Sequence, residues 1–201
     1  MGVHDLRAGV FKLLIAAGTA GCVWGCAELV FPVRPGSPFM EKPGNGLVFG
    51  RIAVIRDGED QLSALPSFPK EFGWVLIQLK SGRKYVTSPL TQNGMFVLDL
   101  PAGSYEVSKL MYEERFGFWE GQLLARFTVQ PDKLTYLGTW EIQFMNLGPS
   151  SPIGGKVLDE QGEASDDLTQ TYTGLSRPIA KGLLESAKEG YLSLLRPRTE
   201  Y

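Results

Sequence analysis

From residue 47 onward the chain alternates short apolar runs with turn residues. The first run, residues 47–55, is rich in Val, Ile and Phe and ends at Arg56-Asp57-Gly58. Later runs of the same kind occupy residues 74–79, 83–87, 95–100, 105–110, 122–129, 135–144 and 156–158. Seven or eight short strands at regular spacing, with turn signals between them, are typical of a mainly-β fold, either a β-sandwich or a barrel. We expect Trp74 and Trp140 in its core, since both lie inside apolar runs.

The C-terminal part has a different pattern. Residues 159–176 are polar and indicate a solvated linker. After it, apolar residues recur at steps of three and four, which predicts an amphipathic C-terminal α-helix: Ile179, Leu183, Leu184, Ala187, Tyr191, Leu194 and Leu195. Ser176 suits its N-cap, Pro178 its first turn and Pro197 its end. Gly182 and Gly190 each cost a helix about 1 kcal/mol, so this one needs a surface to pack on. That surface is either the sheet or a partner protein.

The N-terminus has the order of a secretory signal peptide. Arg7 and Lys12 precede an apolar segment, residues 13–21, that ends in small residues before Cys22. This segment resembles the signal of bacterial lipoproteins, in which the peptidase cuts before a cysteine that has received a diacylglycerol. The resemblance implies a signal peptide over residues 1–21, lipidation of Cys22, and attachment to a membrane of the cell envelope.

Three alternatives to this interpretation stay open. Cys26 is a second candidate for the lipid, with a longer apolar segment before it. Residues 13–33 are long enough to span a bilayer as an uncleaved anchor, although Glu28 lies within them. Free secretion is the third. Neither cysteine is followed by Asp, which by resemblance to enterobacterial sorting rules favours the outer over the inner membrane.

Residues 22–46 are rich in Pro and Gly and indicate an extended tether between the lipid and the domain. In an extended form at about 3 Å per residue, its residues 27–46 would reach on the order of 60 Å. The β-rich domain then spans residues 47–158, and the linker and helix span residues 159–201.

One stretch of the predicted sheet resembles a known family. The segment from Asn93-Gly94 through Phe96, Leu98, Pro101-Ala102-Gly103 and Tyr105 is similar to a motif of carboxypeptidase-regulatory-like and other prealbumin-like domains. The resemblance implies a Greek-key β-sandwich over roughly residues 47–145, in which this motif crosses from one sheet to the other. Phe96, Leu98 and Tyr105 are then core residues, and Gly103 takes a positive φ. It implies little about function.

The composition excludes several functions. The net charge is −2 and no Lys/Arg cluster is present, which argues against nucleic-acid binding. His4, the single histidine, lies in the expected signal peptide, and the cysteines precede the domain. The mature chain therefore lacks the residues for a Ser-His-Asp triad, Cys-His catalysis or a usual zinc site. We expect no cofactor and no bound metal.

Carboxylates are the remaining catalytic candidates. Glu113, Glu114 and Glu120 could pair as acid and base in a hydrolase, or could simply be solvated in a hairpin loop. The acidic residues of segment 159–167 do not have the spacing of an EF-hand, so a solvated linker is favoured there.

Aromatic side chains gather just beyond the 105–110 run. The cluster contains Tyr112, Arg115, Phe116, Phe118 and Trp119. Alternate residues of a strand share a face, so these side chains either pack in the core at a strand end or are exposed as contacts for a partner. The whole sequence favours a non-catalytic envelope lipoprotein that acts as a binding or structural module, with the membrane and an envelope protein or small ligand as its partners. A carrier of a small lipid or sugar is the alternative, and a carboxylate-dependent hydrolase is third.

Overall fold

The computed structural model describes residues 27–36, 39–40, 42–63, 71–87, 90, 94–114, 117–144 and 150–197. The expected signal peptide and both lipidation candidates, Cys22 and Cys26, lie outside these ranges. So do Arg115 and Phe116. Within the described ranges, no helix is long and apolar enough to cross a membrane.

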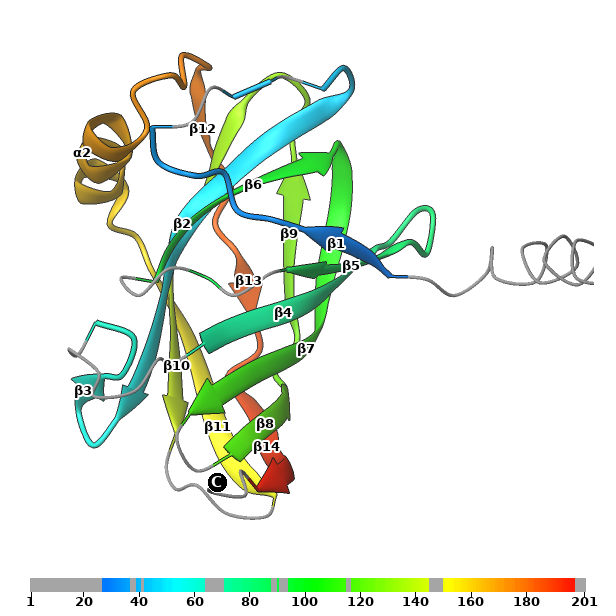
Figure 1. The fold of residues 1–201 in the computed structure, drawn as a ribbon, viewed down its shortest axis with the longest axis vertical. Helices are drawn as coiled ribbons and strands as arrows, with labels where there is room; N and C mark the ends of the chain where they lie inside the picture. Colours follow the sequence, from blue (N-terminus) through cyan, green and yellow to red (C-terminus); the bar gives the residue numbers. More distant parts are fainter. Residues whose placement is uncertain are drawn as a thin grey trace, which may run out of the picture.

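The described residues form a mainly-β fold with one helix. The strands are β1 (Glu28–Val30), β2 (Asn45–Arg56), β3 (Glu59–Asp60), β4 (Glu71–Gln78), β5 (Lys84–Thr87), β6 (Met95–Pro101), β7 (Gly103–Glu114), β8 (Gly117–Gln122), β9 (Ala125–Val129), β10 (Leu134–Phe144), β11 (Ser151–Leu158), β12 (Ile179–Lys181), β13 (Glu185–Ser186) and β14 (Glu189–Pro197). The helix α2 spans Gln161–Thr171. All the strands belong to one sheet, which curls over on itself (Figure 1).

The curl brings two parts of the sheet face to face. In one layer, β2 lies between antiparallel β6 and parallel β10. In the other, β4 lies between β5 and β7, and β7 also pairs with β9. Strands β8, β14 and β11 connect the two layers in the order of the sheet. Trp74 of β4 contacts Phe96 of β6 and Trp140 of β10 across the interior, at ring-centroid distances of 5.1 and 5.8 Å.

The core residues expected from the sequence are buried. Trp74, Trp140, Phe96, Leu98 and Tyr105 are each at most 2% exposed. Their burial follows from the alternation of the strands, which places one side of each strand between the layers.

The segment around the β6–β7 turn also has the expected backbone. Gly94 before β6 and Gly103 at the start of β7 both have positive φ, at 71° and 145°. The hydroxyl of Tyr105 donates to the carbonyl of Pro101 at 2.7 Å, which fixes the turn. Strand β6 belongs to one layer and β7 to the other, so this segment carries the chain across the core.

The predicted C-terminal helix is wrong. Residues 179–197 contain the three strands β12, β13 and β14, which pair with β10, β9, β11 and β8. The physical reason is that these partners offer unpaired backbone groups, whereas Gly182 and Gly190 weaken a helix. Gly190 also sits where a side chain could not, since a Cβ there would overlap the carbonyl oxygen of Gln122.

The helix lies instead in the segment expected to be a linker. Ala164, Leu168 and Tyr172 follow one another at four-residue steps and pack on the outer side of the β2–β6–β10 layer. They form a second apolar cluster with residues of that layer: Leu47, Phe49, Met95, Val97, Leu134 and Tyr136. This cluster explains why so polar a segment is helical: the segment has one apolar stripe, and the sheet gives that stripe a surface to pack on.

The predicted free tether is also corrected where the structure describes it. Strand β1 pairs in parallel with β5, so that Glu28 lies opposite Tyr85. Farther along, the N–H of Val33 donates to the carbonyl of Val97 at 2.8 Å, and Val33 and Phe39 pack against the second apolar cluster. Strand β1, Val33 and Phe39 therefore belong to the folded unit, because β1 extends the edge of the sheet and the two apolar side chains cover the second apolar cluster.

Candidate functional site

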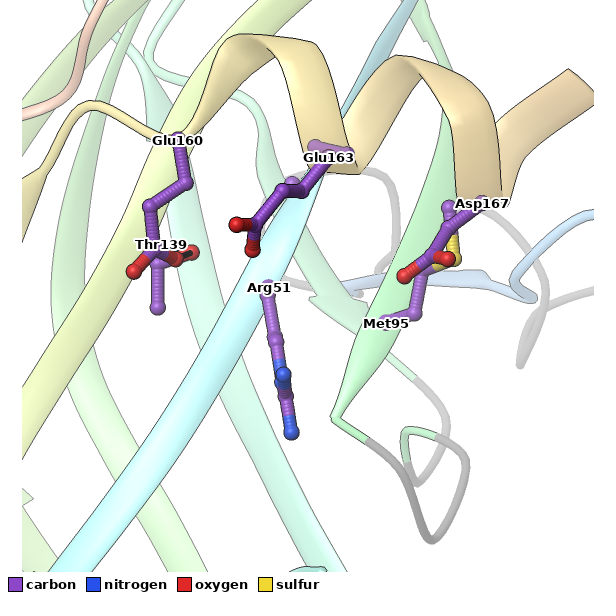
Figure 2. Close-up of a pocket in the computed structure, with 8 residues that line it drawn as sticks. Arg51, Met95, Thr139, Glu160, Glu163 and Asp167 are labelled. Carbon is purple, nitrogen blue, oxygen red and sulfur yellow. Dashed lines mark hydrogen bonds between the residues drawn. The ribbon is translucent and has the colours of Figure 1, made fainter.

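A cleft of about 220 Å³ lies between α2 and the sheet beneath it. Its lining comes from β2, β6, β10 and the first turns of α2: Gly50, Arg51, Met95, Thr139, Glu160, Glu163, Ala164 and Asp167. Figure 2 shows the three acidic side chains of this set extending from the helix towards the sheet. The sequence pattern predicts a solvated linker for these acidic residues and so misses the cleft.

Glu160 fixes the start of α2 on β10. Its backbone N–H donates to the hydroxyl of Tyr136 at 2.8 Å, and its carboxylate accepts from the hydroxyl of Thr139 at 2.7 Å. Burial raises the pKa of Tyr136 above its usual value. Negative charges at the first turn also suit the positive end of the helix dipole. Glu160 therefore has a structural role at the base of the cleft.

Glu163 and Asp167 give the cleft its acidic character. Their carboxylates lie below the helix, Glu163 above Arg51 and Asp167 beside Met95 (Figure 2). The guanidinium of Arg51 points away from them, because it donates to the hydroxyl of Ser63 at 2.9 Å. The cleft can thus accept hydrogen bonds from hydroxyl or amino groups and offers Met95 to an apolar face. Within the described part of the chain, no cluster of three His, Cys, Asp or Glu residues could hold a metal ion.

Of the expected partner contacts, two are core residues. Tyr112 is 1% exposed and Trp119 is 4% exposed, and they lie opposite each other on β7 and β8. The ring of Tyr112 also meets that of Phe144 edge-on, at 5.3 Å between centroids. They cannot form an exposed contact surface, so the core interpretation holds for them. Phe118, one residue from Trp119, is partly exposed on the opposite face.

Two of the candidate catalytic carboxylates, Glu113 and Glu120, lie on the outer face of the same strands. Glu120 accepts a hydrogen bond from the ammonium of Lys109 at 2.6 Å, which occupies it in an ion pair. Glu113 lines a small pocket of about 80 Å³ together with Glu71 and Phe118. The side chain of Glu114 lies outside the described residues.

The cleft residues had one usable signal in the sequence. Ala164, Leu168 and Tyr172 are spaced by four residues, and this line predicts a helix with its acidic residues beside it. The line is short, and the stronger apolar pattern of residues 179–195 favours a helix there instead.

Comparison with known proteins gives no family. No family model matches the chain, and no curated protein matches it. Among solved structures, a leucine-rich repeat protein from Bacteroides thetaiotaomicron is similar at 16% identity over 51% of this chain, with a TM-score of 0.35. The chain covers 14% of that protein. At this TM-score the likeness carries no argument about fold or function.

Proposed function

We propose that the protein is a lipoprotein of the bacterial cell envelope whose β-rich domain is a non-catalytic binding or structural module. The observation that carries the proposal is the N-terminal order of basic residues, apolar segment and small residues before Cys22. A mature lipoprotein carries more than one acyl chain, which makes membrane attachment stable. The absence of Asp after Cys22 and Cys26 favours the outer membrane.

The start of the folded unit supports this arrangement. Glu28 begins β1 at the edge of the sheet, six residues after Cys22. Six residues span about 20 Å at most. The module is therefore held close to the lipid, rather than on a tether of tens of ångströms. Cys26, the alternative acceptor, would hold it closer still.

For the fold, the proposal extends to a prealbumin-like Greek-key β-sandwich. The motif from Gly94 to Tyr105 passes from β6 in one layer to β7 in the facing layer, as it does in the domains that it resembles. The aromatic contacts between Trp74 and Trp140 support two packed layers. Strands β8, β11 and β14, which join the layers into one curled sheet, are then additions to that core.

Intact mass of the protein extracted from bacterial membranes tests the lipoprotein assignment. We expect the wild-type chain to lack its first 21 residues and to carry added acyl chains, and we expect Cys22→Ala to lose both changes. The same result for Cys26→Ala instead would move the site by four residues. An unmodified chain would overturn the proposal. Turnover of a substrate that is lost on substitution of one acidic residue would overturn its non-catalytic part.

A carrier of a small polar ligand is the second candidate, and the cleft under α2 favours it. Its carboxylates and Met95 suit a sugar, whose hydroxyls donate hydrogen bonds and whose ring has an apolar face. The test is titration with a sugar panel by calorimetry. Glu163→Gln and Asp167→Asn should weaken binding, whereas Asp166→Asn, which does not line the cleft, should leave it unchanged. Equal binding by all variants would exclude this cleft.

A further inference from the structure

The outer face of β1, β5 and β4 carries apolar side chains that no other described element covers. Leu29 lies opposite Val86, and Val86 lies opposite Val75, all on the side turned away from the core. Leu29 is 53% exposed, and Phe31, two residues further, is 60% exposed. Ile77 is partly exposed on the same face of β4. Large apolar side chains grouped in this way mark a contact surface.

Cations border this apolar face at one end. The turn between β4 and β5 exposes Leu79, Lys80, Arg83 and Lys84. Among the described residues, none of the three cations makes an ion pair, and Glu28 is the acidic residue at the adjacent start of β1. The turn is therefore net positive and is free to meet an anionic surface.

The chain enters the domain at this same place. Strand β1 runs parallel to β5, so Glu28 lies beside Tyr85, directly after the cationic turn. In Figure 1, the start of β1 and the β4–β5 turn lie on the same side of the molecule. A lipid on Cys22 would then sit within about 20 Å of Glu28, beside the end of this turn, since Glu28 is the sixth residue after Cys22.

We propose that this face rests on the anionic surface of the membrane that carries the N-terminal anchor. We call it the membrane face and define it by Leu29, Phe31, Ile77, Leu79, Lys80, Arg83, Lys84 and Val86. The inference rests on the proposed lipid anchor, which brings the face to the bilayer. Apolar side chains then enter the headgroup region while Lys and Arg bind anionic headgroups, the combination typical of interfacial attachment.

The membrane face also sets the direction of the cleft. Helix α2 packs on the β2–β6–β10 layer, whereas the membrane face belongs to the β5–β4–β7 layer on the other side of the core. Figure 1 shows α2 on the side of the molecule opposite the β4–β5 turn. With the membrane face down, the acidic cleft opens away from the bilayer, where a soluble ligand or partner can reach it.

Photo-crosslinking in the full chain tests the proposal. Benzoylphenylalanine replaces Phe31 on the membrane face or, as the control, Ile179 of β12, which is exposed on the other layer. The protein is expressed in bacteria, and membranes are irradiated and analysed by mass spectrometry. We expect phospholipid adducts at position 31, at least about 10-fold above position 179. The combined variant Lys80→Glu, Arg83→Glu, Lys84→Glu should reduce them about 10-fold or more, because each cation near an anionic surface adds to binding. Lys188→Glu, a reversal of an exposed charge elsewhere, should not.

The outcomes separate this proposal from the lipoprotein assignment. The intact mass of the same samples reports acylation at Cys22 independently of the adducts. Acylated protein without lipid adducts at position 31, or with equal adducts at both positions, would overturn the membrane face alone. Crosslinks from position 31 to a protein would show that a partner protein, and not the bilayer, covers this face, and would also overturn the proposal. Lipid adducts on an unacylated chain would support the membrane face and contradict the lipidation of Cys22. Unchanged melting temperatures show that the variants are folded.

Discussion

The indole ring of Trp74 in β4 stacks on that of Trp140 in β10, with 5.8 Å between ring centroids and 29° between ring planes. The two rings come from opposite layers and are 0% and 1% exposed. The indole N–H of Trp140 also donates to the hydroxyl of Ser186 at 2.9 Å, which ties β13 to the same point. This pair therefore joins the two layers and the C-terminal segment at the centre of the fold.

Trp140→Ala should lower the free energy of unfolding by about 3–5 kcal/mol, because it leaves a large cavity between the layers. Urea unfolding followed by circular dichroism measures it. Leu124→Ala is the control, since Leu124 is 53% exposed and its loss should change the free energy by less than about 0.5 kcal/mol. A cost below about 1 kcal/mol for Trp140→Ala would contradict the central position of this pair.

The strand core could be predicted from the sequence because its signals are local. Trp74, Trp140 and Phe96 each lie in a short β-prone run, and alternation decides which side they take. The turn at Gly103 was predictable for the same reason, since Pro101 fixes its own φ and Gly103 can take a positive φ that other residues resist.

The C-terminal strands and the cleft could not be predicted in this way. Leu184 and Leu192 are buried, and their spacing also fits a helix. Their neighbours are distant in the sequence: the N–H of Leu184 donates to the carbonyl of Leu137 in β10, and Leu192 lies between β11 and β8. Whether such a segment forms strands or a helix depends on free strand edges, and these exist only in the folded sheet. The cleft depends in turn on where α2 packs, so its acidic residues were predictable only as polar.

Because the helix spans Gln161–Thr171 and residues 179–197 contain strands, alanine should change the free energy of unfolding in opposite directions at Gly162 and at Gly190. Gly162 lies in α2, and a Cβ added there would have no atom within 4 Å, so Gly162→Ala should stabilise the protein by up to about 1 kcal/mol. A Cβ at Gly190 would overlap the carbonyl oxygen of Gln122, so Gly190→Ala should destabilise it. Thermal and urea unfolding measure both. Stabilisation by Gly190→Ala would instead favour a helix there.

Gly94, in the turn before β6, and Gly58, in the turn between β2 and β3, form a second matched pair of glycines. Gly94 and Gly58 both have positive φ, at 71° and 82°. Alanine at either position is strained by that backbone, at a cost of roughly 1 kcal/mol. At Gly94 a Cβ would also overlap the carbonyl oxygen of Ile52, whereas Gly58 has open space. Gly94→Ala should therefore cost clearly more than Gly58→Ala in urea unfolding. Equal costs would contradict the close contact between Gly94 and the carbonyl oxygen of Ile52 in β2.

Tyr105 should make the protein sensitive to alkaline pH. Burial, and after it the neighbouring Tyr85, raises the pKa of Tyr105 above its usual value. The unfolded chain loses this proton near pH 10 while the folded chain keeps it. The contribution to stability is thus fully present below about pH 10 and is lost as the pH rises through the folded pKa.

Tyr105→Phe tests this assignment by urea unfolding at a series of pH values. At pH 7 it should cost about 1 kcal/mol, because it removes the hydrogen bond to the carbonyl of Pro101. Above about pH 10 the variant should lose stability less steeply than the wild type, so that the difference between them shrinks. Leu124→Ala removes no titratable group, and its difference from the wild type should stay constant over the same range. A constant difference for Tyr105→Phe as well would show that this hydroxyl ionises alike in the folded and unfolded chains.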